Sequence, residues 1–233
     1  MSRAEPRVML VATIALTFVT GIVDAVGFLG LDRVFTGNMT GNIVILGMGV
    51  AGADELPVLG PAVALAAFTL GAFVAGLALR SLPSGWHGRM TVLLLVGAAT
   101  LCGLTAAAAL VGDHPSVPVQ VVMAAATAAV MGQQAMVARA LAVKDMTTVV
   151  VTSTLAGLAG ETWVSAASGR VINRRAGAIL VIFAGAVAGA LLLRVHFAIP
   201  FAVAAAVTVA VVVALRRRSR DAAEPDVRRR AVL

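Results

Sequence analysis

Charged residues, cysteine and aromatic side chains are all scarce in this sequence. Lys, Arg, Asp and Glu together make up 12% of the 233 residues, about half the share found in a soluble domain, whereas 60% are hydrophobic. The charges that are present lie between long apolar runs. This pattern excludes a soluble globular domain and predicts an integral membrane protein whose surroundings are the lipid bilayer.

The scarcity of reactive side chains also limits the chemistry. Cys102 is the single cysteine, so it forms no intramolecular disulfide, and within its apolar run we expect a small buried residue. His87, His114 and His196 lie in or beside expected loops without ligand spacing, so we expect no metal and no other cofactor. The sequence also lacks a central carboxylate pair, a Ser–His pair and a phosphate-binding loop, and we expect no enzymatic activity.

The net charge of +7 comes from tails and loops. Charges placed there orient a chain in a membrane, whereas a nucleic-acid site needs a basic face on a folded surface. We therefore expect no nucleic-acid partner.

Eight apolar runs follow one another along the chain. A spanning helix needs about 20 apolar residues, and six runs approach or exceed that length: 8–30, 58–80, 90–111, 116–138, 176–193 and 197–215. Two shorter runs, 37–52 and 146–160, each come second in a group of four. Thr36 and Thr40 align with Thr148 and Thr152 in this arrangement, which predicts an internal duplication.

The charges between the runs predict how the chain crosses the membrane. If all eight runs crossed, Glu55 would be cytoplasmic and Arg80 outside, against the preference for positive cytoplasmic loops. If the two short runs instead enter and return on one side, both assignments reverse. The sequence therefore predicts an all-α membrane protein with six transmembrane helices and two short re-entrant helices.

This topology divides the chain into two halves of opposite orientation. Residues 8–111 and 116–215 then form an inverted repeat of three-span units, a common plan among transporters. The N-terminus (1–7) and the basic tail (216–233) are expected to be cytoplasmic, in a protein of the inner or plasma membrane.

Two Thr-Gly-Asn triplets mark the start of the first short run. On a helix, Asn38 and Asn42 would share one face, with Thr36 and Thr40 beside them. Polar side chains at bilayer depth are costly unless they are buried in protein or line a wet cavity. We expect this stretch to form part of a site. The alternative is that its small residues only pack helices while the polar groups hydrogen-bond across them.

The start of each short helix is a further candidate. Re-entrant geometry would point both N-termini at the midplane, where free N–H groups favour an anion or a polar neutral solute. Asp24 is the carboxylate well inside a long run, and such groups are functional candidates. It can carry a proton, hold a cation, or accept hydrogen bonds from Asn38, Asn42 or a short helix. The alternative is a structural carboxylate near the outer interface.

The corresponding part of the second half carries amides in place of the charge. Gln133 and Gln134 either line a polar path or bond across helices. The second short run is rich in hydroxyl groups, among them Thr148 and Thr152, although helical Thr also bonds to its own backbone.

Three motifs stand out: Gly21-x-x-Asp24, Phe35-x-x-Asn38-x-Thr40-Gly41-Asn42 and Thr147-Thr148-x-x-x-Thr152-x-Thr154-Leu155. With these motifs the sequence resembles the YoaK-like family, uncharacterised bacterial membrane proteins with a domain of unknown function (DUF1275). The resemblance covers about residues 10–215. It implies a multi-spanning inner-membrane protein and names no substrate. The family often has Gln-Asn where this chain has Gln134-Ala135.

Together these observations favour a transporter or channel for a small polar or anionic solute. The runner-up is a non-transporting interaction or assembly protein, and an intramembrane enzyme comes third. Both monomer and homo-oligomer remain open. The residues expected along the solute path are Asp24, Thr36, Asn38, Thr40, Asn42, Gln133, Gln134, Thr148 and Thr152.

Overall fold

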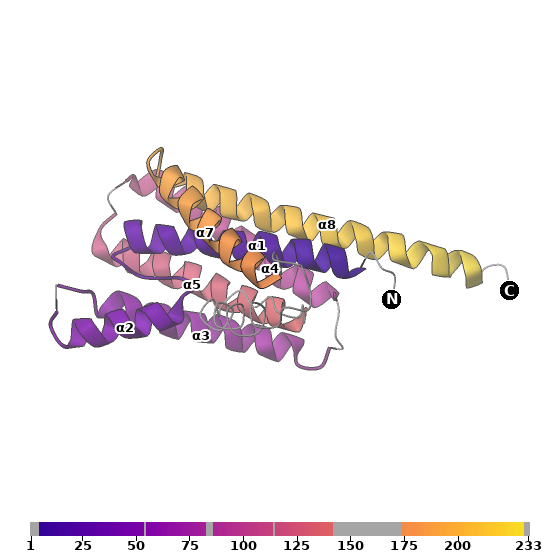
Figure 1. Ribbon diagram of the computed structural model, residues 1–233, viewed down its shortest axis with the longest axis horizontal. Coiled ribbons are helices and arrows are strands. Elements are labelled where there is room, and N and C mark those ends of the chain that lie inside the picture. The colour runs from indigo at the N-terminus through magenta and orange to yellow at the C-terminus, as the bar shows by residue number, and fades with distance from the viewer. Residues whose placement is uncertain (1–4, 54, 83–85, 114, 142–173, 231–233) are drawn as a thin grey trace, which may run out of the picture.

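The computed structural model describes residues 5–53, 55–82, 86–113, 115–141 and 174–230 (Figure 1). The secondary-structure elements in these ranges are α-helices. Six of them are long and apolar enough to cross a membrane: α1 (Glu5–Gly30), α3 (Leu59–Leu79), α4 (Gly88–Val111), α5 (Val117–Ala140), α7 (Arg174–Leu193) and α8 (Ile199–Arg230). A shorter helix, α2 (Met39–Val50), has 12 residues. The expected all-α fold with six membrane-spanning helices is confirmed. The second expected short helix, 146–160, lies outside the described residues.

Local sequence sets several helix ends. Pro118 lies in the first turn of α5, where a missing N–H costs nothing. Gly112 follows α4 with a φ of 78°, a left-handed conformation that glycine adopts without strain. The connection between α4 and α5 is therefore short, and the two helices are antiparallel neighbours.

Two sets of contacts define opposite ends of the bundle. At one end Asp113, between α4 and α5, accepts a hydrogen bond from the N–H of Phe197, between α7 and α8 (3.1 Å). The Phe197 ring also lies against Gly30, the last residue of α1. At the other end the Arg89 guanidinium of α4 donates to the carbonyl of Ala78 in α3 (3.0 Å). Successive long helices therefore run in opposite directions (Figure 1).

The short helix α2 does not cross the bundle. Gly49, near its C-terminus, lies close to the carbonyls of Leu56 and Pro57, which lead into α3. Gly60, in the first turn of α3, packs against the Val34 side chain just beyond α1. Because α1 ends and α3 begins at the same end of the bundle, residues 31–50 leave that end and return to it (Figure 1).

The chain reverses direction immediately after α1. The N–H groups of Leu31 and Val34 both donate to the carbonyl of Gly27, at 3.1 and 3.2 Å. Asp32 and Arg33 complete the turn with φ values of 58° and 57°. Gly27 permits this reversal because a Cβ there would collide with the carbonyl oxygen of Val34.

This tight turn sets how far the excursion extends along α1. The chain reaches only the level of Asp24 before α2 begins. Asp24 is five residues beyond Val19, the midpoint of the span Val8–Gly30, which is roughly 7 Å along the helix. Along α1, the N-terminus of α2 therefore lies at the level of Asp24, and its expected position at the midplane stays a prediction.

The structure also corrects the start of this helix. The sequence predicted a helix over 37–52, but α2 begins at Met39 and Asn38 caps it. Thr36 and Gly37 precede the helix because their N–H groups are bound by a side chain of α1. Asn38 and Asn42 therefore do not share a helix face.

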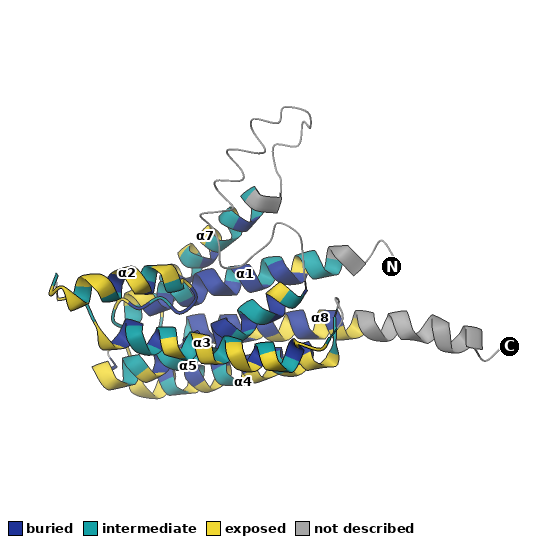
Figure 2. Ribbon diagram, turned by 90° about the horizontal axis from the view of Figure 1, so that it is seen from below, coloured by how far each residue is buried: buried dark blue, intermediate teal, exposed yellow. Residues whose placement is uncertain are grey.

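α1 and α5 lie at the centre of the bundle. Their apolar windows are each 56% buried, compared with 17% for α3 and for α7. Figure 2 shows much of α1 in dark blue, whereas α2, α3 and α4 carry broad yellow faces. Cys102 on α4 is exposed and not buried as expected. α4 is apolar all round, so its sequence does not mark which face turns inward.

Candidate functional site

A carboxylate on α1 accepts hydrogen bonds from the backbone that leads into α2. Oδ1 of Asp24 accepts the N–H of Thr36 at 2.9 Å and that of Gly37 at 2.6 Å. Longer contacts come from the N–H of Asn38 (3.4 Å) and the hydroxyl of Thr36 (3.5 Å). Hydrogen bonds to a carboxylate are about twice as strong as neutral ones. Asp24 and the start of α2 therefore form one structural unit within the length of a membrane span.

Gly37 allows the two backbones to approach. A Cβ at this position would lie 2.8 Å from Cγ2 of Thr20 and 3.4 Å from Oδ1 of Asp24. The second carboxylate oxygen, Oδ2, accepts no hydrogen bond from the described residues, and Asp24 is partly exposed. One oxygen of Asp24 thus holds the chain in place while the other remains available to a ligand.

Asn42 fastens the same segment from the α2 side. Its Oδ1 accepts the N–H of Phe35 at 2.8 Å, and its Nδ2 donates to the carbonyl of Phe35 at 2.6 Å. The Asn42 side chain is fully buried, as is that of Thr36. Both amide atoms of Asn42 are therefore used within the protein, which is the packing alternative considered for this residue.

Asn38 and Thr40 have a different environment. Both are exposed, and Oδ1 of Asn38 accepts the N–H of Gly41 at 3.2 Å, which caps α2. The Nδ2 group of Asn38 and the hydroxyl of Thr40 make no hydrogen bond that the described residues account for. Of the four polar residues in the two triplets, these two keep polar groups available to a solute.

The two glutamines of α5 bond across helices. Gln133 donates to the carbonyl of Leu93 in α4. Gln134 is buried and donates to the carbonyl of Leu16 (3.0 Å) and to the hydroxyl of Thr20 (3.2 Å), both in α1. These bonds join α5 to its neighbours on two sides. Gln134, through Thr20, lies one turn of α1 away from Asp24.

Sequence reasoning missed a polar stripe on α1. Thr13, Thr17 and Thr20 are all buried, and each hydroxyl donates to the carbonyl four residues earlier. With Asp24 they follow a 4-3-4 spacing, which places them on one face of the helix. That spacing is visible in the sequence and is the signal that would have revealed the stripe.

The described grooves lie away from this unit. One runs between α4 and α8, and the other lies on α3 beside Leu65, Thr69 and Phe73. Neither is lined by Asp24 or by residues 36–42. Thr148 and Thr152, expected on the opposite side of the path, lie outside the described residues.

The electrostatics of the unit are set by its own carboxylate. Free N–H groups ahead of α2 were expected to favour an anion or a polar neutral solute. Those of Thr36 and Gly37 are instead donated to Asp24, so an acceptor oxygen of the protein already occupies them. What remains for a ligand is an oxygen acceptor on Asp24 and the exposed polar groups of Asn38 and Thr40.

Comparison with known proteins finds a family model that covers most of the chain, including Asp24 and residues 36–42. Residues 12–214 match the family described as protein of unknown function (DUF1275). The chain is 33% identical over 159 residues to the UPF0700 transmembrane protein YoaK of Bacillus subtilis (strain 168), covering 68% of each chain. No solved structure matches.

Proposed function

The chain belongs to the DUF1275 family of multi-pass membrane proteins, and from this premise we propose that it is a transporter or channel for a small polar solute. The observation that carries the proposal is the pairing of Asp24 with the N–H groups ahead of α2, within the length of a membrane span. An ionisable side chain at this depth is costly to bury, so a residue of this kind within a span is a candidate for function. Short helices that stop inside the membrane, with their N-termini at a polar group, form the binding sites of many transporters.

Two similar helix crossings support the inverted repeat, and the first is between α1 and α7. α1 and α7 cross at glycines, where a Cβ on Gly21 would meet the carbonyl of Ile182. A Cβ on Gly185 would in turn meet the carbonyl of Phe18. Each helix therefore presents a bare backbone to the carbonyl of the other, and the two pack without intervening side chains.

The crossing of α3 and α5 has the same form. Here a Cβ on Gly132 would meet the carbonyl of Phe68, and one on Gly71 the carbonyl of Ala129. The α5 positions follow their α1 counterparts by 111 residues (132 − 21 and 129 − 18). The α7 positions follow their α3 counterparts by 114 (185 − 71 and 182 − 68). The exchange of α1 with α5 and of α3 with α7 maps one crossing onto the other, as an inverted repeat requires.

The charge of the unit narrows the class of solute. The N–H groups that would have attracted an anion are already matched by Asp24. An anionic solute would also meet the negative Oδ2. A neutral polar solute or a small cation suits the remaining acceptors better, so the proposal is narrowed to these two classes.

The distribution of positive charge supports an inner- or plasma-membrane protein with both termini in the cytoplasm. Ser81 and Arg89 lie at the end of the bundle where α1 begins, and Arg33 and Glu55 at the other. Arg89 and the arginines of the tail then face the cytoplasm, and Glu55 faces away from it. Arg33, at the end of α1, and Arg194, just beyond α7, are the exceptions among the described arginines.

Solute flux in reconstituted vesicles tests the proposal. Vesicles that contain the full chain are challenged with neutral polar solutes, monovalent cations and monovalent anions, and flux is followed by light scattering and ion-selective dyes. We expect flux of a neutral or cationic solute above protein-free vesicles, and a loss of at least about tenfold in Asn38→Leu/Thr40→Val. Val44→Leu, a change at an exposed apolar position of α2, is the matched control. No flux in any of the three classes contradicts the proposal.

One observation favours the alternative, a non-transporting interaction or assembly protein. Thr36 and Asn42 are fully buried, and the two amide atoms of Asn42 bond to the protein backbone. In that case the unit around Asp24 serves only to fold residues 31–50. Under this alternative, the Asn38→Leu/Thr40→Val variant removes binding to a protein partner and vesicles show no flux.

A further inference from the structure

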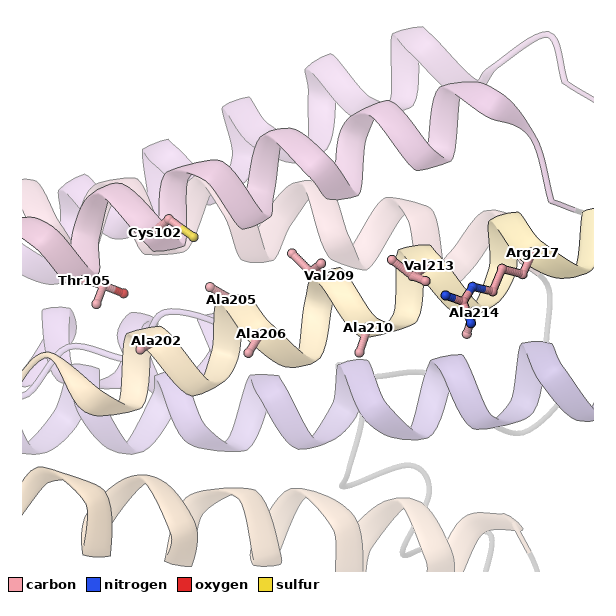
Figure 3. Close-up of a pocket in the computed structure, with 10 residues that line it drawn as sticks. All are labelled: Cys102, Thr105, Ala202, Ala205, Ala206, Val209, Ala210, Val213, Ala214 and Arg217. Carbon is pink, nitrogen blue, oxygen red and sulfur yellow. The ribbon is translucent and has the colours of Figure 1, made fainter.

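A groove of about 700 Å³ runs between α4 and α8 on the outside of the bundle (Figure 3). Cys102 and Thr105 of α4 form one wall. On α8, Ala205, Val209 and Val213 line the groove on the side of α4 (Figure 3). Alanines at 202, 206, 210 and 214 line it on the adjoining face, since they repeat every four residues. Because these side chains stop at Cβ, the surface of α8 is shallow along this face. The groove is therefore open to whatever surrounds the bundle.

The groove is long compared with a lipid monolayer. Its α8 wall extends from Ala202 to Arg217, which is 15 residues or about 22 Å along the helix. The hydrocarbon core of a bilayer is about 30 Å thick. The apolar run 197–215 ends just before Arg216 and Arg217, which places Arg217 at a membrane interface. From there the groove runs inward past the middle of the hydrocarbon.

One end of the groove carries a positive charge. The Arg217 side chain extends back along α8 toward Val213 and Ala214 (Figure 3), as long side chains on helices do. Arg217 is exposed and forms no ion pair with the residues that the structure describes. The neighbouring Arg216 is also exposed but does not line the groove. The lining is otherwise apolar or uncharged, so the charge is confined to the interfacial end.

We propose that this groove binds an anionic phospholipid, with an acyl chain along the alanines of α8 and the phosphate headgroup at Arg217. An apolar channel that ends in a cation at the interface matches the two parts of such a lipid. The arginine-rich segment that follows, expected on the cytoplasmic side, adds attraction for anionic headgroups. The proposal does not depend on solute transport.

Charge argues against a second copy of the chain as the occupant. Two copies in one membrane have the same orientation, so a symmetric contact along α8 places both Arg217 side chains at the same depth. Like charges brought together disfavour that contact. The α3 groove provides an internal comparison, because Leu65, Thr69 and Phe73 line it without a charged residue. It should hold lipid chains without regard to headgroup.

Cys102 is the single cysteine and lines the groove, so a label on it reports which lipid occupies the groove. A fluorophore on Cys102 of the full chain is quenched by lipids with brominated chains in vesicles of mixed composition. We expect phosphatidylglycerol to quench about fivefold more effectively than phosphatidylcholine at equal mole fraction, the preference that one arginine near an anionic surface provides. Arg217→Gln should remove this preference, and the matched variant Arg216→Gln should keep it.

A second measurement avoids the label. In native mass spectrometry, the unlabelled chain should retain bound phosphatidylglycerol. The variant Ala206→Leu/Ala210→Leu fills the groove and should lose the bound lipid. Its thermal unfolding midpoint should stay within a few degrees of that of the parent chain. Equal quenching by the two lipids overturns the proposal, as does an equal loss of preference in Arg216→Gln and Arg217→Gln. Efficient oxidative crosslinking of Cys102 between two chains would show a second copy in the groove and would also overturn it.

Discussion

The carboxylate of Asp24 and the backbone N–H of Gly37 lie 2.6 Å apart, although 13 residues separate them in the chain. This bond and the adjacent one to Thr36 tie α1 to the segment that leads into α2. It is the point at which the excursion between α1 and α3 is anchored. The proposed transport and the fold of residues 31–50 both depend on it.

Two replacements of Asp24 should distinguish the contribution of its charge to stability from that of its hydrogen bonds. Asp24→Leu leaves the N–H groups of Thr36 and Gly37 without an acceptor and should cost about 3 kcal/mol of the free energy of unfolding in bicelles. Asp24→Asn keeps a carbonyl acceptor and should cost about 1 kcal/mol. Thr17→Val is the control, since that hydroxyl bonds only within α1, and it should cost less than either. Equal stability of Asp24→Leu and the parent chain would contradict the anchoring role.

Loss of the Asn42 amide should loosen the segment locally. Asn42→Leu removes both hydrogen bonds to Phe35, so hydrogen exchange of the Phe35 amide should accelerate by at least about tenfold. Exchange in α5 should remain unchanged. Asn38→Ser retains a capping oxygen for α2 and serves as the matched variant. If exchange at Phe35 is the same in the Leu variant and the parent chain, Asn42 does not hold this segment.

Leucine substitutions of glycines at the two helix crossings should lower the free energy of unfolding by similar amounts. Gly21→Leu and Gly132→Leu each drive a side chain into a facing carbonyl and should cost about 3 kcal/mol or more. Gly103→Ala, in α4, meets nothing within 4 Å and should instead stabilise the chain by about 0.5–1 kcal/mol. Thermal unfolding in detergent orders the three variants. A large cost at one crossing with none at the other would contradict the exchange of the two halves.

Much of the helical layout can be read from the sequence, because hydrophobic length is a direct consequence of bilayer thickness. The run expected at 58–80 is α3, Leu59–Leu79, and the short run is α2. The start of α2 could not be read in the same way. Thr36 and Gly37 are compatible with a helix, and only the position of Asp24 in space shows that their N–H groups are used elsewhere.

The sequence did not decide between the partners of Asp24 and did not predict the exposure of Cys102, for different reasons. Three partners for Asp24 fitted the sequence, and the backbone ahead of α2 is the one found. Cys102 lies in a helix that is apolar on all sides, where no polar face marks the outside. Lipid and protein interior favour the same side chains, so hydropathy does not distinguish them.

The central claim is that residues 31–50 leave one face of the membrane and return to it. Single cysteines at Arg33, Glu55 and Ser81, all exposed positions, test it in a Cys102→Ala background with a membrane-impermeant thiol reagent. In intact cells the reagent should label Arg33→Cys and Glu55→Cys, and it should label Ser81→Cys only after permeabilisation. Labelling of Arg33→Cys and Glu55→Cys from opposite sides would mean that α2 crosses the membrane, and would contradict the account.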